Sequence, residues 1–481
     1  MDFGITAVGA YAPRLRLSRA AIAAAHRWMA PALASSAKGE RAFCSWDEDA
    51  ITMAVEAARD CVPPEGRAGV SSLILASTTL PYADMSNASV VAGALDLREG
   101  ARTAEATGSQ RAATSALAQA IEARAEGALL VASERPTARP ASAQEMQQGA
   151  GAAALRLGTG ELIAKALGAA SVNAAFADHV RAAGATADYA WEERWIRDEG
   201  YAKIVPRAIS AALAEAGIPA GELAHFVMPS PIRGAAASVA RTVGFRGEVA
   251  DDLVAGCGLT GAAHPFLMLA KVLETAEAGE KILLVGFGQG ADAIVLEATG
   301  RRPAGRGVTG ALADRVPTED YLRMLSFYGR IELEWGMRAE AADKAALTAA
   351  WREAGQLSAF KAGRCPDCGT IQFPQLAYCV TPGCGAHAER FEQVSLADAP
   401  AKVLTYTADW LSYHPAPPLV VGFVQFENGA RLLMETVDAD PAAVDVGLPL
   451  RMVFRLKKID ARSGFRRYFW KATPDGVAAT G

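Results

Sequence analysis

Short apolar runs alternate with longer alanine-rich segments through residues 1–300. Residues 72–77 (Ser-Leu-Ile-Leu-Ala-Ser) and 128–133 (Ala-Leu-Leu-Val-Ala-Ser) predict buried strands, because polar turn residues bound each run. Between them, apolar residues at helical spacing from Ala112 to Ile121 predict a helix. Strands at 225–228 and 281–285 and helices at 201–216 and 262–276 repeat the theme. This order predicts an α/β domain with an internal duplication.

After residue 300 the pattern changes. Residues 300–310 hold four glycines, three arginines and a proline, which predicts a linker, and residues 318–360 are polar and helix-prone. Runs at 403–407, 419–426, 431–435 and 450–456 have β-type composition with turn residues between them, which predicts a small all-β barrel or sandwich. We expect an α/β domain over 1–300, a linker and helical connector over 301–363, a ribbon over 364–390 and a barrel over 391–481.

The ribbon is predicted from four of the seven cysteines, Cys365, Cys368, Cys379 and Cys384. Each pair forms a tight turn that directs two thiolates at one ion, and four sulfur ligands favour zinc over hard cations. Four ligands leave no open position for a substrate, so the zinc is expected to be structural. An iron–sulfur or redox role is the alternative, and His387 is expected at the surface.

The length and net charge of the chain narrow the class of protein. A chain of 481 residues predicts two or three domains, and a net charge of −5 gives no general attraction to nucleic acid or anionic membranes. Residues 1–11 lack the pattern of a secretory signal, and no apolar run is long enough to span a membrane. We expect a cytoplasmic protein with no membrane partner.

A basic stretch lies near the end of the chain. Residues 451–471 contain eight basic residues, one acid (Asp460) and interleaved aromatic residues. On a barrel, this stretch could bind single-stranded nucleic acid, the phosphates of CoA or an acidic partner, or it could be a solvated strand face with aromatic residues turned inward. The rest of the chain carries a net charge of −12, which disfavours a nucleic-acid partner.

Several of these segments carry a family resemblance. Residues 4–13, 45–54, 127–133, 258–265 and 285–292 resemble the hydroxymethylglutaryl-CoA synthase family of the thiolase superfamily. The cysteine ribbon, followed by residues 403–407 and 417–422, resembles the zinc-ribbon/OB-fold proteins that accompany thiolases. The resemblance implies a duplicated five-layer αβαβα thiolase fold, followed by a helical connector, a zinc ribbon and a small OB-type barrel. It also implies a homodimer, a CoA thioester as substrate or ligand, and a thiolase subunit as partner.

The family's catalytic positions are altered in this chain. The superfamily places a nucleophilic cysteine at the amino end of a buried helix, where the helix dipole and a histidine lower its pKa. Aligned on the family's Cys-x-Ala-Gly-Thr-x-Ala-Leu pattern, that position holds Gln110, which forms no thioester but can donate a hydrogen bond to an oxyanion. The histidine, asparagine and acid positions hold Pro229, Leu259 and Thr79. The alignment implies that the usual acyl-transfer residues are absent.

Two alternative nucleophiles are present. Ser109 precedes Gln110, but the sequence shows no base to activate it. Cys257 and His264 share one loop region and could form a nucleophile–base pair, although a cysteine between glycines is more often a small buried side chain.

Other residues have a binding and a structural interpretation. Gly288 and Gly290 could form an oxyanion-binding loop or only a tight turn, and Arg306 could bind phosphate or belong to a solvated linker. Other polar residues are expected to serve the fold: acids that cap a helix (Asp47, Glu48, Asp49) and histidines used in packing or at the surface (His26, His179, His225).

Three functions remain open from the sequence, and whether the chain is an enzyme is undecided. It could be a scaffold or acyl-CoA-handling subunit of a thiolase-type complex that forms or cleaves C–C bonds. It could be a stand-alone acyl-CoA condensing or aldolase-type enzyme that uses residues other than cysteine. A nucleic-acid-binding module that uses the barrel is the least favoured.

Overall fold

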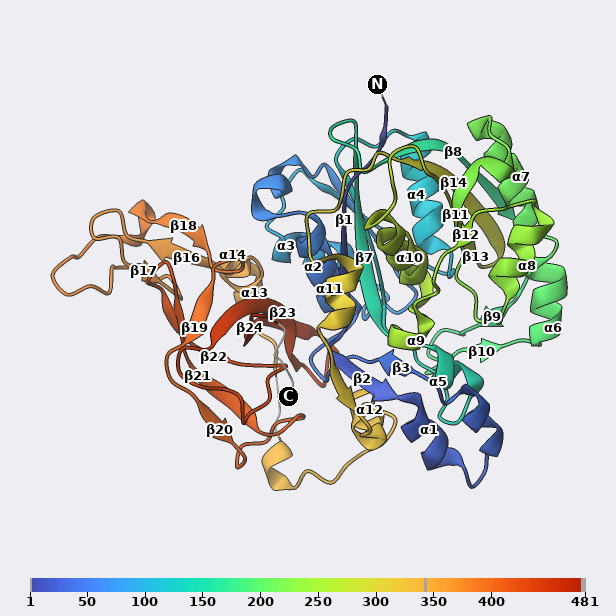
Figure 1. The fold of residues 1–481 in the computed structure, drawn as a ribbon. Coiled ribbons are helices and arrows are strands. Elements are labelled where there is room, and N and C mark those ends of the chain that lie inside the picture. The colour runs from blue at the N-terminus through green and yellow to red at the C-terminus, as the bar shows by residue number, and fades with distance from the viewer. Residues whose placement is uncertain (1, 341–343, 477–481) are drawn as a thin grey trace. The chain divides into compact units, whose positions relative to one another are not determined.

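The computed structural model describes residues 2–340 and 344–476 and divides into two compact units (Figure 1). Of these residues, the first unit comprises 2–45, 49–89 and 98–328, and the second comprises 46–48, 90–97, 329–340 and 344–476. Within the described residues, no helix is long and apolar enough to cross a membrane.

The first unit is built on a ten-stranded mixed sheet made of two similar halves. The strands of the first half are β1 (Gly4–Tyr11), β4 (Ser72–Ala76), β5 (Arg102–Ala106), β6 (Ala128–Glu134) and β7 (Gly151–Gly158). Those of the second are β8 (Ala164–Asn173), β11 (Leu223–Val227), β12 (Glu248–Val249), β13 (Lys281–Phe287) and β14 (Gly290–Ala298). The orders β5-β4-β6-β7-β1 and β12-β11-β13-β14-β8 are the same when each half is numbered along the chain. The internal duplication predicted from the sequence is therefore confirmed.

Helices fill three layers around these half-sheets. α4 (Ala112–Glu122) and α10 (His264–Leu273) contact strands of both halves and form the middle layer. α2 (Ala50–Cys61) covers the outer face of the first half, while α7 (Val205–Ala216) and α8 (Ala235–Thr242) cover that of the second. The five-layer α/β fold is as predicted. α7 begins four residues later than expected, because residues 196–201 form a π-helical turn before it.

Shorter elements complete the first unit. They are β2 (Leu15–Ser18), α1 (Arg19–His26), β3 (Glu40–Ala42), α5 (Ala143–Gln147), β9 (His179–Val180), β10 (Tyr189–Ala190), α6 (Glu193–Trp195), α9 (Val254–Cys257), α11 (Gly307–Ala313), β15 (Val316–Thr318) and α12 (Tyr321–Phe327). α3 (Asn87–Ala94) begins in the first unit, and its residues from Val90 onward belong to the second. The first unit continues to Tyr328, beyond the expected boundary at 300, because β15 pairs with β2 and α11 packs on β1. The expected linker is therefore helical from Gly307 onward.

The second unit contains a ribbon and a barrel. Its short helices are α13 (Leu347–Arg352) and α14 (Ala354–Leu357), and its ribbon strands are β16 (Lys361–Arg364), β17 (Ile371–Gln372) and β18 (Glu392–Ser395). The barrel strands are β19 (Ala401–Val403), β20 (Thr407–Asp409), β21 (Leu419–Phe426), β22 (Arg431–Glu435), β23 (Pro449–Ile459) and β24 (Arg466–Pro474). The expected strand at 403–407 is thus divided between β19 and β20. β24, which pairs antiparallel with β23, was not predicted.

Two basic residues of the 451–471 stretch are internal. Arg455 is 1% exposed and lies 3.1 Å from Glu48, and Lys471 is 2% exposed and lies 2.9 Å from both Asp47 and Glu435. These carboxylates neutralise the charges that the sequence suggested for phosphate binding. Asp49 caps α2 as expected, through the amides of residues 51 and 52, whereas Asp47 and Glu48 serve as ion-pair partners instead.

Candidate functional site

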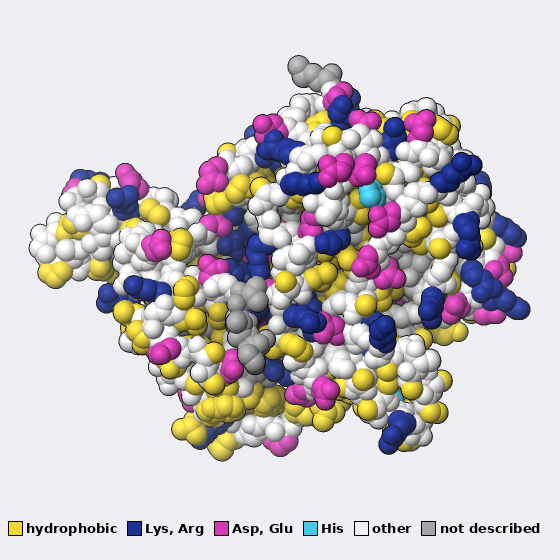
Figure 2. All heavy atoms as spheres, in the orientation of Figure 1, with side chains coloured by type: hydrophobic (Ala, Val, Ile, Leu, Met, Phe, Trp, Pro, Cys, Tyr) yellow, Lys and Arg dark blue, Asp and Glu magenta, His cyan; other side chains and the backbone are white. Residues whose placement is uncertain are grey.

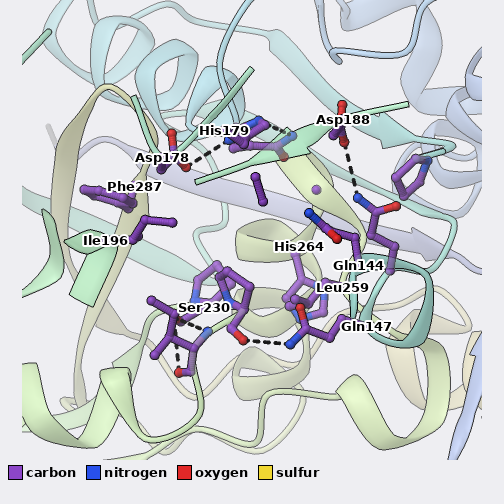
Figure 3. Close-up of a pocket in the computed structure, with 18 of the residues that line it drawn as sticks. Gln144, Gln147, Asp178, His179, Asp188, Ile196, Ser230, Leu259, His264 and Phe287 are labelled. Atoms are coloured by element: carbon purple, nitrogen blue, oxygen red, sulfur yellow. Dashed lines mark hydrogen bonds and ion pairs between the residues drawn. The ribbon is translucent and has the colours of Figure 1, made fainter. Parts of the chain in front are cut away.

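A cavity of about 410 Å³ lies beside the turn that leads into α4 (Figure 3). Gln110, Pro229 and Leu259, which come from segments far apart in the chain, all line it. Three of the four residues that the sequence aligns with the family's catalytic positions therefore meet around one space. His264, Phe287 and Tyr201 contribute to the remaining wall.

The turn that carries Gln110 is held firmly by its neighbours. The hydroxyl of Ser109 donates to the carbonyl of Gly288 at 2.8 Å, and Nε of Arg111 donates to the same carbonyl at 2.9 Å. Arg111 also pairs with the fully buried Asp292 at 2.8 Å. The Ser109 hydroxyl thus helps to fix the turn, and no histidine among the described residues bonds to it.

The glycine loop between β13 and β14 is a tight turn. The Gly288 amide donates to the carbonyl of Gly290 at 3.0 Å, and Gly290 pairs with Asn173 of β8. A Cβ atom on Gly286 would lie 2.0 Å from the hydroxyl oxygen of Thr114 in α4. Of the two interpretations left open by the sequence, the geometry favours the sheet-closing turn, since the Gly288 amide is already engaged.

Cys257 and His264 are bonded to other groups. The Cys257 thiol donates to the carbonyls of Leu253 and Gly258 at 3.3 and 3.4 Å, and burial raises its pKa to about 11. Nδ1 of His264 accepts from the Thr260 amide at 3.1 Å, while Nε2 donates to the Asp252 carbonyl at 2.7 Å. Burial lowers the pKa of His264. The geometry favours a structural role for both residues.

Arg306 is also engaged by protein groups. Its guanidinium pairs with Asp314 at 3.0 Å, and its backbone amide donates to Asp60 at 2.7 Å. The side chain is 46% exposed. These contacts fit an arginine that fastens the segment before α11.

An acid stands close to the altered acid position. The carboxylate of Glu134, at the end of β6, accepts hydrogen bonds from the hydroxyls of Thr78 and Thr79 at 3.1 and 3.2 Å and also from the Thr78 amide. Glu134 and Gln110 both lie against Gly261, where an added Cβ would come within 3.0 Å of each. Burial raises the pKa of Glu134 to about 7, although its hydrogen bonds oppose the shift. Sequence reasoning missed this residue, because the end of a buried strand carries no signal of its own.

Glu134 is expected to make stability depend on pH. Its folded-state pKa is raised, so the protonated side chain favours folding, and the free energy of unfolding should fall by about 3 kcal/mol as the pH rises from about 4.5 to 7. Glu134→Gln should flatten this slope in urea unfolding at pH 5 and pH 8. Glu122→Gln, at an exposed position, is the control and should keep the wild-type slope. An unchanged slope in Glu134→Gln would contradict the assignment.

The cavity also holds an unexpected histidine–aspartate pair. Nδ1 of His179 lies 2.9 Å from Asp178 (Figure 3). Its Nε2 lies 3.4 Å from the side-chain nitrogen of Gln110. Gln289 donates to the other Asp178 oxygen at 2.7 Å. Burial lowers the pKa of His179, but the hydrogen bond and charge of Asp178 outweigh burial, so the net pKa is raised. From the sequence, His179 was expected to have only a packing or surface role, whereas the structure places it in the cavity wall with Asp178 as its partner. The only local signal was the Asp-His dipeptide.

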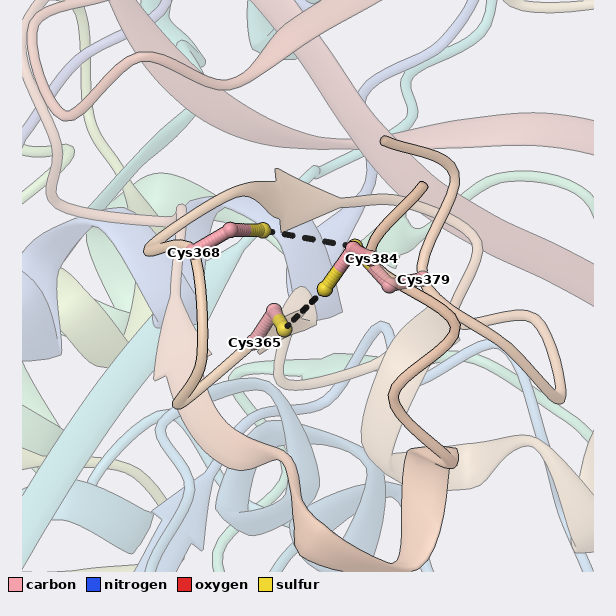
Figure 4. Close-up of side chains that lie close together, drawn as sticks. All are labelled: Cys365, Cys368, Cys379 and Cys384. Carbon is pink, nitrogen blue, oxygen red and sulfur yellow. Dashed lines mark hydrogen bonds between the residues drawn. The ribbon is translucent and has the colours of Figure 1, made fainter. Parts of the chain in front are cut away.

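The four cysteines of the ribbon converge as predicted (Figure 4). All four sulfur atoms lie within 4.8 Å of one another, with Cys365 and Cys384 3.6 Å apart and Cys368 and Cys379 3.5 Å apart. Four thiolates on one tetrahedral zinc lie about 3.8 Å apart, given the usual zinc–sulfur distance. The residues therefore fit a closed structural zinc site. His387 lies outside this set and is 46% exposed, as expected.

Comparisons with known proteins match separate parts of the chain. Residues 352–390 match the family described as the ChsH2 rubredoxin-like zinc ribbon domain, and residues 394–455 match the ChsH2 C-terminal OB-fold domain. The chain is 28% identical over 361 residues to a hydroxymethylglutaryl-CoA synthase of Aeropyrum pernix, covering 71% of this chain and 94% of that protein. It is 33% identical over 131 residues to a DUF35 domain-containing scaffold protein of Methanocaldococcus jannaschii, covering 26% of this chain and 87% of that protein.

Solved structures agree on the fold. PksG, a HMG-CoA synthase from Bacillus subtilis, has a TM-score of 0.59 at 16% identity, covering 72% of this chain and 95% of that chain. FabH from Pseudomonas aeruginosa, a 3-oxoacyl-(acyl carrier protein) synthase III, has a TM-score of 0.54 at 24% identity, covering 63% of this chain and 99% of that chain. At these identities the likeness establishes the thiolase-type fold alone. The predicted architecture and family resemblance are confirmed.

Proposed function

We propose that this chain, which belongs to the DUF35 family through its C-terminal zinc ribbon and OB-fold, handles acyl-CoA without an acyl-enzyme intermediate. Its first unit is hydroxymethylglutaryl-CoA synthase-like. In this proposal the chain is a subunit of a thiolase-type complex that forms or cleaves C–C bonds. Its resident metal is zinc, held by the four ribbon cysteines, and the zinc supplies folding energy rather than chemistry.

One observation carries the proposal. Gln110 stands at the family's nucleophile position and lines a cavity of about 410 Å³ together with Pro229 and Leu259. A cavity of this size can hold the acyl end of a thioester. An amide there can donate a hydrogen bond to the thioester oxygen but cannot become acylated. The site therefore retains binding capacity without covalent catalysis.

The barrel supports the assembly part of the proposal. Phe423 of β21 and Leu433 of β22 lie directly opposite each other and are 45% and 65% exposed. Trp410 and Leu411, after β20, are 69% and 72% exposed, and hydrophobic side chains gather around β20 in Figure 2. Exposed apolar surface of this kind marks protein interaction sites. The relative from Methanocaldococcus jannaschii is named a scaffold protein, and we extend that role to this barrel with a thiolase subunit as its partner.

The first unit is proposed to pair with a second copy. β5 forms one edge of the large sheet, and its residues are half-buried or exposed. An open strand edge can pair with another chain. A homodimer would cover this edge.

Intact-mass measurement after incubation with acetyl-CoA tests the absence of an acyl-enzyme. The wild-type chain is expected to bind acetyl-CoA in calorimetry yet gain no acetyl mass, and Gln110→Ala should weaken binding about fivefold through one lost hydrogen bond. Gln110→Cys is the matched variant and should acquire the adduct, since the cavity brings the thioester to this position. An acetylated wild-type chain would contradict the proposal.

Co-purification and turnover then separate a subunit from a stand-alone enzyme. The chain is expected to elute with a thiolase from its native extract and to condense or cleave acyl-CoA only in that complex. If the isolated chain condenses or cleaves acyl-CoA thioesters, it is instead a stand-alone condensing or aldolase-type enzyme.

A further inference from the structure

His179 has the contacts of a proton-transfer group. It sits on β9, and its ring reaches the cavity beside Gln110. Nδ1 lies 2.9 Å from Asp178, so this carboxylate fixes the tautomer that leaves the lone pair on Nε2. Asp178 is in turn oriented by Gln289 at 2.7 Å. A histidine oriented by a carboxylate in this way is the usual arrangement of a general base.

The hairpin that carries this pair is fastened to the first unit. Arg181 pairs with Asp188 at 2.7 Å and donates to the carbonyl of Thr78. Gln148 donates to the second Asp188 oxygen at 3.2 Å. Asp188 is therefore held from both sides, and it keeps β9 and β10 over the cavity (Figure 3). The position of the imidazole is set by several contacts rather than by one loop conformation.

Gln110 provides the complementary group. Its side-chain nitrogen is 3.4 Å from Nε2 of His179, a long contact that a bound ligand can replace. Gln110 lies just before α4, so the positive end of that helix is close to any negative charge that develops on a ligand oxygen bound to its side-chain amide. The cavity thus places a base and an oxyanion donor side by side, where the family's nucleophile is missing.

We infer that His179 reversibly removes a proton from the α-carbon of an acyl-CoA thioester bound in this cavity, while the Gln110 amide donates a hydrogen bond to the thioester oxygen. The C–H bond breaks, its electron pair forms the enolate, and the proton is carried on Nε2 of His179. Returning the proton to the same carbon restores the thioester, so no co-reactant is needed. This inference rests on the proposed acyl-CoA binding and adds the chemistry of the same site.

The inference is tested by incubating the full chain with propionyl-CoA in deuterium oxide. Mass spectrometry of the propionyl-CoA then measures the exchange of its α-hydrogens. The wild type is expected to exchange, and His179→Ala should lose roughly 10²- to 10⁴-fold in rate. Asp178→Asn should lower the exchange rate by a smaller factor and leave the half-saturation concentration of propionyl-CoA unchanged. The reason is that Asp178 orients the base and does not bind the ligand. His225→Ala, whose ring bonds to Glu280 outside the cavity lining, should exchange at the wild-type rate.

Each other outcome overturns one of the two statements. If the wild type binds propionyl-CoA in calorimetry but does not exchange it, or if His179→Ala exchanges within twofold of wild type, the base assignment is wrong while the binding proposal stands. If the wild type does not bind propionyl-CoA, the proposed function fails and the base assignment fails with it. His179→Gln keeps a polar side chain of similar reach, and it gives the same decision if the alanine variant is poorly folded.

Discussion

Cys365→Ser is expected to abolish zinc binding and unfold the ribbon. The ribbon sheet has strands of only four, two and four residues, and its buried cluster consists of Cys365, Cys379, Ala386 and Phe391. So small a core cannot offset the entropy of ordering the loops, whereas structural zinc sites supply about 10–16 kcal/mol. The loss should appear as less than one zinc per chain and as rapid proteolysis within residues 364–390.

Two variants serve as controls for the ribbon. His387→Ala removes a potential ligand in the same segment but should leave zinc content unchanged, because this histidine lies outside the sulfur cluster. Cys61→Ala removes a buried cysteine of α2 and should also retain the metal. Full zinc content in Cys365→Ser, or loss of zinc in His387→Ala, would contradict the four-cysteine assignment.

Asp292→Ala is expected to lower the free energy of unfolding by about 3–5 kcal/mol. Asp292 is fully buried and accepts from Arg111 at 2.8 Å, Thr114 at 2.9 Å, Ser115 at 2.6 Å and Ser171 at 2.7 Å. Its removal leaves the mostly buried Arg111 charge uncompensated and releases the turn that carries Gln110. Urea unfolding, followed by a probe of the first unit, measures the change.

An exposed ion pair gives the matched comparison. Arg197 and Asp198 lie 2.8 Å apart, but their side chains are 49% and 53% exposed. Asp198→Ala should therefore leave the free energy of unfolding almost unchanged, because water solvates both partners. A similar cost for the two variants would show that burial does not determine the strength of the Asp292 contacts.

The parts of the fold that the sequence predicted depend on local pattern. Strands β4 and β6 are covered on both faces, so they are nearly continuous apolar runs that stand out from their polar flanks. The zinc site was also predictable, because its geometry follows from the spacing of two cysteine pairs. β24 was missed because its charged residues interrupt the apolar pattern that predicts a strand. One of them, Lys471, is neutralised by Asp47, which lies 424 residues away in sequence.

The candidate site was only partly predictable for the same reason. The alignment placed Gln110, Pro229 and Leu259 at the positions of the family's catalytic cysteine, histidine and asparagine. These three residues do line one cavity. The contact between His179 and Gln110 joins residues 69 positions apart through a short hairpin, and no local signal reports it. Glu134 likewise acquires its raised pKa only from burial and from Thr78 and Thr79. Chemistry that arises from tertiary contact has to be read from the structure.

The repeated strand order has a consequence for how the first unit unfolds. α4 belongs to the first repeat and α10 to the second, yet each is covered by strands of both repeats. Loss of either half-sheet would expose an apolar face of both helices to water, so neither repeat retains a complete core without the other. The two repeats should therefore lose their structure in one cooperative transition, although the chain path would suggest two separable folding modules.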